Sequence, residues 1–124
     1  PYPHARKVGN LLFLSGVGPR KPGMKTIPGV ELDKSGNILS YNIVDQCRSV
    51  FENVRYILKD AGSHWDNLVD VTVFLTNMKN DFPVYNQIYA EYFKNNQPCR
   101  TTVEVTALPT PIAIELKCIA AIRK

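Results

Sequence analysis

The sequence is poor in cysteine and histidine and has no long apolar run, and each shortage excludes a class of protein. Its three cysteines show no C-x-x-C spacing, so neither a disulfide framework nor a zinc knuckle is supported. The two histidines stand alone without metal-ligand spacing, so no bound metal is expected. No membrane-length apolar segment and no basic, apolar signal segment is present. We expect a soluble, cytoplasmic protein with no membrane partner.

Basic side chains outnumber acidic ones but do not form a long basic stripe. Fifteen Lys and Arg against eleven Asp and Glu give a net charge of +4 and a pI near 9.1. The only adjacent pairs are Arg6-Lys7, Arg20-Lys21 and Arg123-Lys124. A surface that tracks phosphates needs a continuous row of cations. We therefore expect no nucleic-acid partner, although the high pI keeps RNA binding open as an alternative.

The 124 residues fit one domain spanning residues 1–124. Apolar residues recur three and four positions apart from Asn42 to Ala61 and again from Asp81 to Phe93, which predicts two amphipathic helices. Asn42 is the expected N-cap of the first helix, and Gly62 ends it. The aromatic residues of the second helix are interpreted as core.

Turn-bounded segments rich in β-branched and aromatic residues predict five strands. They run from Ala5 to Val8, Leu11 to Ser15, Leu68 to Thr76, Arg100 to Val105 and Ile112 to Ala121. The Gly9-Asn10 turn predicts that the first two pair antiparallel, and the Thr106 to Pro111 connection predicts the same for the last two. Residues 16–39 are expected to be a long loop with a short strand near Val30 to Leu32. The predicted architecture is α+β in two layers, a mostly antiparallel sheet packed on two helices.

Alternation along the last two strands predicts where their charged side chains lie. The apolar residues from Ile112 to Ala120 share one face of the last strand, which sends Glu115 and Lys117 to the other face. If the valines of the preceding strand face the helices, Arg100 and Thr102 lie on the same face of the sheet as Glu115. The sequence therefore predicts one charged constellation on the face opposite the helices.

Two segments, Leu11 to Leu14 and Leu68 to Leu75, are apolar on both faces, whereas two helices can cover only one. The simplest cover for the second face is another copy of the chain, so we predict a homo-oligomer with the constellation near a subunit boundary. Clefts between subunits favour small ligands. Arg100 can anchor a carboxylate by two parallel hydrogen bonds, and Glu115 can orient or deprotonate water. An ordinary cross-strand salt bridge is the alternative interpretation.

Other catalytic motifs fail at specific positions. Ser15 is not part of a G-x-S-x-G elbow. The Gly16 to Gly18 segment is followed by prolines that obstruct the helix a dinucleotide loop requires, so a dinucleotide-binding loop is not supported. Cys99 stands next to Arg100, where a lowered pKa would make it reactive, but an idle thiol is the preferred interpretation.

Several motifs together resemble the reactive intermediate deaminase family, also called the Rid or YjgF-like family. They are residues 1–4 (PYPH), 8–16 (VGNLLFLSG), 53–54 (NV), 71–75 (VTVFL), 85–89 (YNQIY), 98–105 (PCRTTVEV) and 108–109 (LP). The resemblance covers nearly the whole chain, and the R-x-x-V-E-V segment that begins at Arg100 is its most specific part.

The resemblance implies a chorismate-mutase-like (ferredoxin-like) α+β fold, a homotrimer with clefts between subunits, and cofactor-free hydrolysis of imine or enamine carboxylic acids to keto acids and ammonia. It implies that Arg100 binds the substrate carboxylate and that Glu115 holds the attacking water. Tyr2 is expected at the mouth of the cleft, with Ser15 and Gly16 lining it, and Asn86 is placed among the substrate-binding residues.

Two departures from the family pattern bear on specificity. Thr102 stands where many members have cysteine, so this chain lacks that thiol, although the backbone carbonyl at position 102 can still position water. The segment from Gly16 to Gly29 is longer and more basic than in many members, and resembles the 2-aminomuconate deaminase branch. Arg20, supported by Lys21 or His4, would then meet the second carboxylate of that substrate. An exposed basic loop without a role in binding is the alternative interpretation.

These observations favour a hydrolytic deaminase whose preferred substrate is 2-aminomuconate. The alternative enzymatic function is a deaminase of broad specificity for 2-imino acids, for which 2-aminoacrylate is the test substrate. From a different class, a non-catalytic small-ligand sensor or RNA-binding protein stays open.

Overall fold

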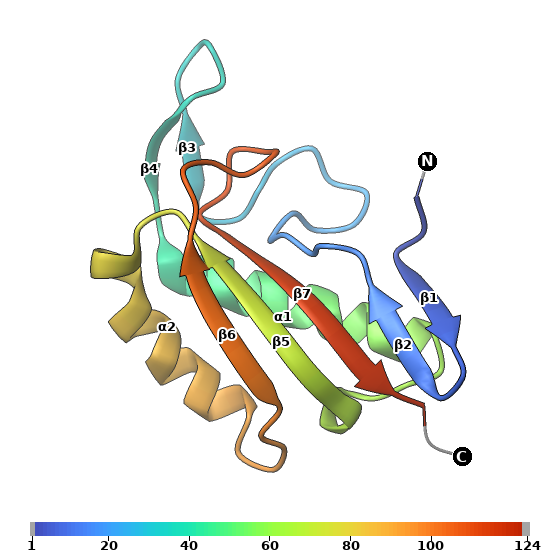
Figure 1. Cartoon of the computed structure of the whole chain (residues 1–124). Coiled ribbons are helices and arrows are strands. Elements are labelled where there is room, and N and C mark those ends of the chain that lie inside the picture. Colours follow the sequence, from blue (N-terminus) through green and yellow to red (C-terminus); the bar gives the residue numbers. More distant parts are fainter. Residues whose placement is uncertain (1, 123–124) are drawn as a thin grey trace.

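Two helices lie behind a five-stranded sheet, and a separate two-stranded hairpin projects beyond one end of that sheet (Figure 1). The computed structural model describes residues 2–122, so Pro1 and the basic pair Arg123-Lys124 lie outside the described residues. The strands are β1 (Ala5–Val8), β2 (Leu11–Leu14), β3 (Val30–Leu32), β4 (Ile38–Tyr41), β5 (Leu68–Leu75), β6 (Cys99–Glu104) and β7 (Ile114–Ala121). The helices are α1 (Ile43–Asp60) and α2 (Met78–Tyr92), with a 3-10 turn η1 (Trp65–Asn67) before β5. This is the predicted α+β fold.

The order of strands corrects one part of the predicted topology. The sheet runs β1-β2-β7-β5-β6, and β6 pairs with β5 in parallel rather than with β7. The other three pairs are antiparallel. Because α2 carries the chain from the end of β5 back to the start of β6, the two strands must run in the same direction. The predicted hairpin between the last two strands is therefore wrong, while the first hairpin is confirmed and turns at Gly9 with φ +60°.

Helix α1 has the predicted cap and the predicted buried face. The Asn42 side chain accepts a hydrogen bond from the Asp45 amide at 3.1 Å, which satisfies one of the free donors of the first turn. Past the other end, Gly62 takes φ +83°, a conformation that favours glycine.

Helix α2 begins three residues before the predicted position, because two acceptors stabilise an earlier start. The Asn77 side chain accepts from the amide of Asn80, and the Glu104 carboxylate of β6 accepts from the amide of Met78 at 2.9 Å. An anion at this end also interacts favourably with the helix dipole. Pro83 consequently lies in the second turn of α2.

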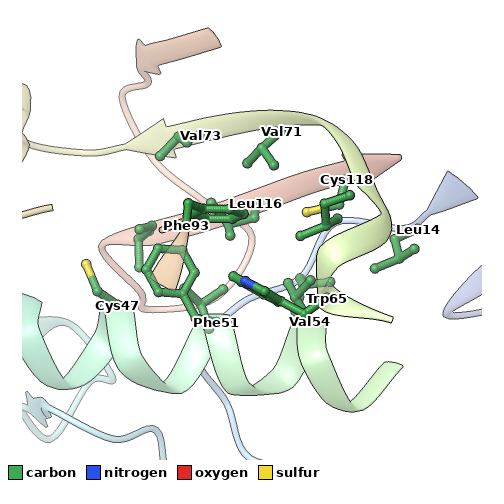
Figure 2. Packing of buried hydrophobic residues seen from close by; sticks show 14 of the residues in the cluster. Leu14, Cys47, Phe51, Val54, Trp65, Val71, Val73, Phe93, Leu116 and Cys118 are labelled. Carbon is green, nitrogen blue, oxygen red and sulfur yellow. The ribbon is translucent and has the colours of Figure 1, made fainter. Parts of the chain in front are cut away.

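The core lies between the sheet and the helices (Figure 2). Phe51 of α1 is fully buried, and it contacts Trp65 edge-to-face with ring centroids 5.8 Å apart. The alternation predicted for β7 is confirmed, since Leu116 and Cys118 face the helices and are buried, whereas Glu115 and Lys117 are half-buried on the other face.

The alternation predicted for β6 is wrong. Arg100 lies beside Val71 and Thr102 beside Val73, and both valines are fully buried against the helices. Arg100, Thr102 and Glu104 therefore occupy the helix side of the sheet, and Val103 lies beside Phe74 on the open side with 37% of its surface exposed. The physical reason is that β6 is an edge strand whose helix-side positions are polar contacts for α2.

The face of the sheet opposite the helices is open within the described residues, and it is partly apolar. Val8, Leu11 and Val103 contribute exposed side chains to it, and Phe13 and Phe74 are half-buried there. This is the second face for which the sequence predicted another copy of the chain as cover.

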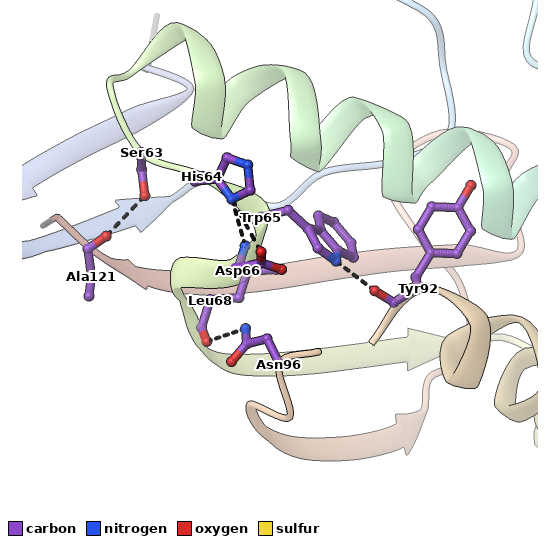
Figure 3. A network of polar contacts seen from close by, with 8 residues as sticks. All are labelled: Ser63, His64, Trp65, Asp66, Leu68, Tyr92, Asn96 and Ala121. Carbon is purple, nitrogen blue, oxygen red and sulfur yellow. Dashed lines mark hydrogen bonds and ion pairs between the residues drawn. The ribbon is translucent and has the colours of Figure 1, made fainter. Parts of the chain in front are cut away.

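Side-chain hydrogen bonds to distant elements hold η1 and the turn before it in place. Two bonds tie η1 and the turn before it to distant elements: Ser63 Oγ donates to the Ala121 carbonyl at 2.9 Å and Trp65 Nε1 to the Tyr92 carbonyl at 2.8 Å (Figure 3).

The predicted short strand β3 is confirmed, but its antiparallel partner β4 was not predicted. Over residues 2–122, no helix has the length and apolarity that crossing a membrane requires.

Candidate functional site

Glu115 lies on the open face of β7, directly against Gly16. A Cβ atom added to Gly16 would lie 2.9 Å from Glu115 Oε2, so only glycine leaves room for the carboxylate. Burial raises the pKa of Glu115 above its ordinary value of 4.5. A carboxyl group with a raised pKa is a stronger base than an ordinary glutamate and can return the proton that it takes.

The chain segment before Gly16 is held by the N-terminal residues. Ser15 Oγ donates to the Pro3 carbonyl at 2.6 Å, and the Ser15 amide donates to the His4 carbonyl at 2.9 Å. Tyr2 directly precedes Pro3, which these bonds hold beside the Ser15-Gly16 segment. The Tyr2 side chain is 75% exposed. We call Tyr2, Ser15, Gly16 and Glu115 the acid cluster.

Lys117 shares the open face of β7 with Glu115, and its ammonium donates to the Leu14 carbonyl. The regular pairing of β2 with β7 ends at Phe13, and an isolated bridge between Val17 and Leu116 resumes it out of register. Lys117 therefore satisfies a carbonyl where the ladder is interrupted. This contact fixes the irregular backbone from which Ser15 and Gly16 arise.

Arg100 lies on the helix side of β6 and is oriented by α2. Its Nη1 donates to Asn86 Oδ1 at 2.9 Å. Its Cζ lies 4.7 Å from the ring centroid of Tyr89, 5.6 Å from that of Phe82 and 5.7 Å from that of Tyr85. Within residues 2–122 the guanidinium has no carboxylate partner, so the predicted alternative of a cross-strand salt bridge is wrong for Arg100.

Thr102 lies two residues beyond Arg100 on the same side of β6. Its hydroxyl oxygen is buried and has no hydrogen-bond partner among the described residues, and the same is true of the Tyr85 hydroxyl. Burying a hydroxyl group without a hydrogen-bond partner costs stability, so two such groups are unusual in a folded protein. We call Arg100, Asn86 and Thr102 the arginine cluster.

One chain does not bring the two clusters together. Arg100 is paired with Val71 on the helix side of β6, whereas Glu115 is paired with Phe74 on the open side of β7, and β5 separates the two strands. The two positions also differ by three residues along β5, or about 10 Å. The predicted single constellation on one face is therefore wrong.

The loop carrying Arg20 is fastened to α1 by its backbone. Asn53 Nδ2 donates to the carbonyls of Gly18 and Arg20 at 2.9 and 2.8 Å, and Ser49 Oγ donates to the Pro19 carbonyl at 2.6 Å. The Arg20 side chain is exposed and forms no hydrogen bond or ion pair in the part of the chain that the structure describes. The structure thus fixes the loop next to Gly16 and leaves the Arg20 cation open.

A hollow of about 780 Å³ lies elsewhere, between α1, η1 and the end of α2. None of the predicted site residues lines it. Its cations alternate with carboxylates, and two of them are paired: Arg48 with Glu91 at 3.0 Å and Arg55 with Glu52 at 3.5 Å. It therefore does not join the two clusters.

One feature of the site was not predicted from the sequence. The aromatic residues of α2 were interpreted as core, but three of them also contact Arg100. Positions 82, 85 and 89 are three and four residues apart, so these side chains lie with Asn86 on one face of α2. In a parallel β5-α2-β6 unit this face is turned toward β6, so predicting the parallel pair would have indicated the contact.

Comparison with known proteins identifies the family. The Endoribonuclease L-PSP family model matches residues 1–122. A RutC family protein of Pyrococcus horikoshii is 42% identical over 120 residues, which cover 97% of this chain and 86% of the relative. Reactive Intermediate Deaminase A, chloroplastic, of Arabidopsis thaliana is 38% identical over 98% of this chain and 59% of the relative.

Solved structures agree with this assignment. The crystal structure of E. coli TdcF with bound serine superposes with a TM-score of 0.83 and 31% identity, covering 100% of this chain and 89% of that chain. The architecture and the sequence match along nearly the full chain lead to one conclusion: the chain belongs to the Endoribonuclease L-PSP family, which also contains the RutC and reactive intermediate deaminase proteins.

Proposed function

We propose that this protein is a cofactor-free hydrolytic deaminase that converts an imine or enamine carboxylic acid to the keto acid and ammonia, in a homotrimer whose subunits share each site. The observation that carries the proposal is the division of the site into two clusters. The acid cluster of one subunit would face the arginine cluster of the next, because neither contains both an anion-binding group and a proton-transferring group.

Arg100 would hold the substrate by its carboxylate. A guanidinium offers five N–H donors in a planar fork, and Asn86 occupies only one of them. Two parallel hydrogen bonds to a carboxylate fix both the position and the plane of the substrate. The imine carbon next to that carboxylate is then presented to the acid cluster.

Glu115 would hold and activate the attacking water. An enamine tautomerises to an imine, and the water oxygen adds to the imine carbon while its proton passes to the Glu115 carboxylate. Glu115 returns this proton to the nitrogen, which gives a carbinolamine. The carbinolamine hydroxyl then passes its proton through Glu115 to the same nitrogen, the carbon–nitrogen bond breaks, and ammonia leaves as the carbonyl forms. The raised pKa of Glu115 suits this exchange, because the group must both accept and return a proton.

For the substrate we propose 2-aminomuconate, with 2-aminoacrylate as the test for broad activity. The support for a substrate with two carboxylates is the exposed Arg20, held by the loop that continues from Gly16. Lys21 and His4 are also exposed and could assist Arg20. The bound serine of TdcF, an amino acid with its own carboxylate, supports the general substrate class.

The direct test measures ammonia released from enzymatically generated 2-aminomuconate and from 2-aminoacrylate. We expect release faster than in buffer, and Arg100→Ala should lose at least about 100-fold in kcat/KM while keeping the wild-type oligomer. Wild-type turnover by Arg100→Ala would refute the anchor. Acceleration of 2-aminoacrylate alone would refute the preference for 2-aminomuconate.

A second variant tests the role of Arg20. Arg20→Ala should raise KM about tenfold for 2-aminomuconate and leave KM for the monocarboxylate 2-aminoacrylate unchanged. Equal losses on both substrates would remove Arg20 from substrate recognition.

A further inference from the structure

The Arg100 side chain has surroundings that are unusual for an arginine on an edge strand. The described residues give its guanidinium one hydrogen bond, from Nη1 to Asn86, and no carboxylate. A long arginine side chain can adopt many rotamers, so further contacts are needed to hold it in one orientation.

The rings of α2 supply that restraint without cancelling the charge. Tyr89 is the nearest, with its centroid 4.7 Å from Cζ, and Phe82 and Tyr85 lie at 5.6 and 5.7 Å. A guanidinium attracted to aromatic faces keeps its remaining N–H donors and its full positive charge available, whereas a carboxylate partner would use both.

We infer that Tyr89 is a positioning residue, whose ring holds the Arg100 guanidinium in the orientation that receives the substrate carboxylate. This inference rests on the proposed function. Tyr89 is half-buried and packs on Tyr85 and Phe93 with centroid distances of 5.6 and 4.2 Å. The ring is therefore fixed by its own neighbours and can restrict Arg100 in turn.

The same helix offers a matched control. Tyr92 also packs on core aromatics, with its centroid 4.7 Å from that of Phe51, and it lies under a different cation, with Arg55 Cζ 5.5 Å from the ring. Tyr92→Leu therefore removes a ring of equal size and a similar cation contact from α2, without touching Arg100.

The experiment compares Tyr89→Leu, Tyr89→Phe and Tyr92→Leu with the wild type. KM and kcat are measured with 2-aminoacrylate, and the Kd of pyruvate, the keto acid it yields, is measured by NMR titration. Loss of the ring contact should raise KM and the pyruvate Kd about 3- to 30-fold in Tyr89→Leu, with kcat changed by less than about twofold. Tyr89→Phe keeps the ring and should restore wild-type values, and Tyr92→Leu should not alter them.

Wild-type KM and Kd in Tyr89→Leu, an equal rise in Tyr92→Leu, or failure of Tyr89→Phe to restore them would each overturn the inference. Failure of the proposed function is distinguishable. A wild type that binds pyruvate through Tyr89 but does not accelerate 2-aminoacrylate hydrolysis would refute the deaminase and keep the positioning role.

Discussion

Because residue 16 is glycine, the Glu115 carboxylate has room to lie against the backbone at this position. Since a Cβ at this position would lie 2.9 Å from Glu115 Oε2, Gly16→Ala must displace the carboxylate. The displaced atom is the end of a flexible side chain, so we expect a loss of stability below about 1 kcal/mol, together with at least a tenfold loss of deaminase kcat, on the order seen for misplaced catalytic groups. Steady-state kinetics and urea unfolding measure the two effects.

Gly18→Ala is the matched control, because its added Cβ would meet the side chain of Ile112 at 3.0 Å and not Glu115. It should keep most of the activity. Equal activity losses in Gly16→Ala and Gly18→Ala would show that loop strain, and not the displaced carboxylate, causes the defect.

The raised pKa of Glu115 also predicts how stability depends on pH. The folded protein holds this proton at higher pH than the unfolded chain, so the contribution of Glu115 to stability falls as pH rises from its ordinary pKa of 4.5 through the raised value. Glu115→Gln removes the ionisation. It should match the wild type below that window and be more stable above it, as measured by urea unfolding at about pH 4 and about pH 8.

Glu31→Gln changes an exposed glutamate of β3 in the same way and serves as the control. At about pH 8, Glu31→Gln should not show the gain in stability that is expected of Glu115→Gln. A Glu115→Gln protein that is less stable than the wild type at the higher pH would contradict the burial of this carboxyl group.

Among the elements, those with strong local patterns were predicted and those defined by their neighbours were not. Helix α1 followed from its apolar spacing and the Asn42 cap, and β7 from strict alternation. Strand β6 has the same kind of alternation, but alternation alone does not say which side faces the helices. Edge position reversed the expected side, because the polar residues of β6 contact α2 and its valine faces the open side.

The contact between Glu104 and the start of α2 explains part of that reversal and can be tested. Glu104→Ala removes the acceptor for the Met78 amide, which should lower the free energy of unfolding by about 1 kcal/mol, the usual cost of losing a helix cap. Glu104→Gln keeps an acceptor oxygen and should lose less.

Glu52→Ala is the surface control, since Glu52 pairs with Arg55 at 3.5 Å and both side chains are about half exposed. It should change stability by less than about 0.5 kcal/mol. A Glu104→Ala protein as stable as Glu52→Ala would show that β6 does not hold the start of α2.

For the complete chain, the candidate site residues could be named from the sequence, but their arrangement could not. Resemblance to the family supplied Arg100, Glu115 and Asn86 one by one. Whether they meet depends on the order of strands in the sheet and on the partners of its open face, which no local pattern encodes. The exposed apolar side chains of that face, Val8 at 57% and Leu11 at 40%, favour cover by a second copy.

Mixing two inactive variants tests the shared site most directly. Arg100→Ala retains the acid cluster and Glu115→Gln retains the arginine cluster, so the two are unfolded together, refolded at equal concentrations, and assayed for ammonia release from 2-aminoacrylate. If each site combines two subunits, random assembly restores about one quarter of the wild-type activity, because half of the subunits on each side of an interface are intact. If each subunit carries its own complete site, the mixture stays as inactive as either variant alone, and the account is wrong.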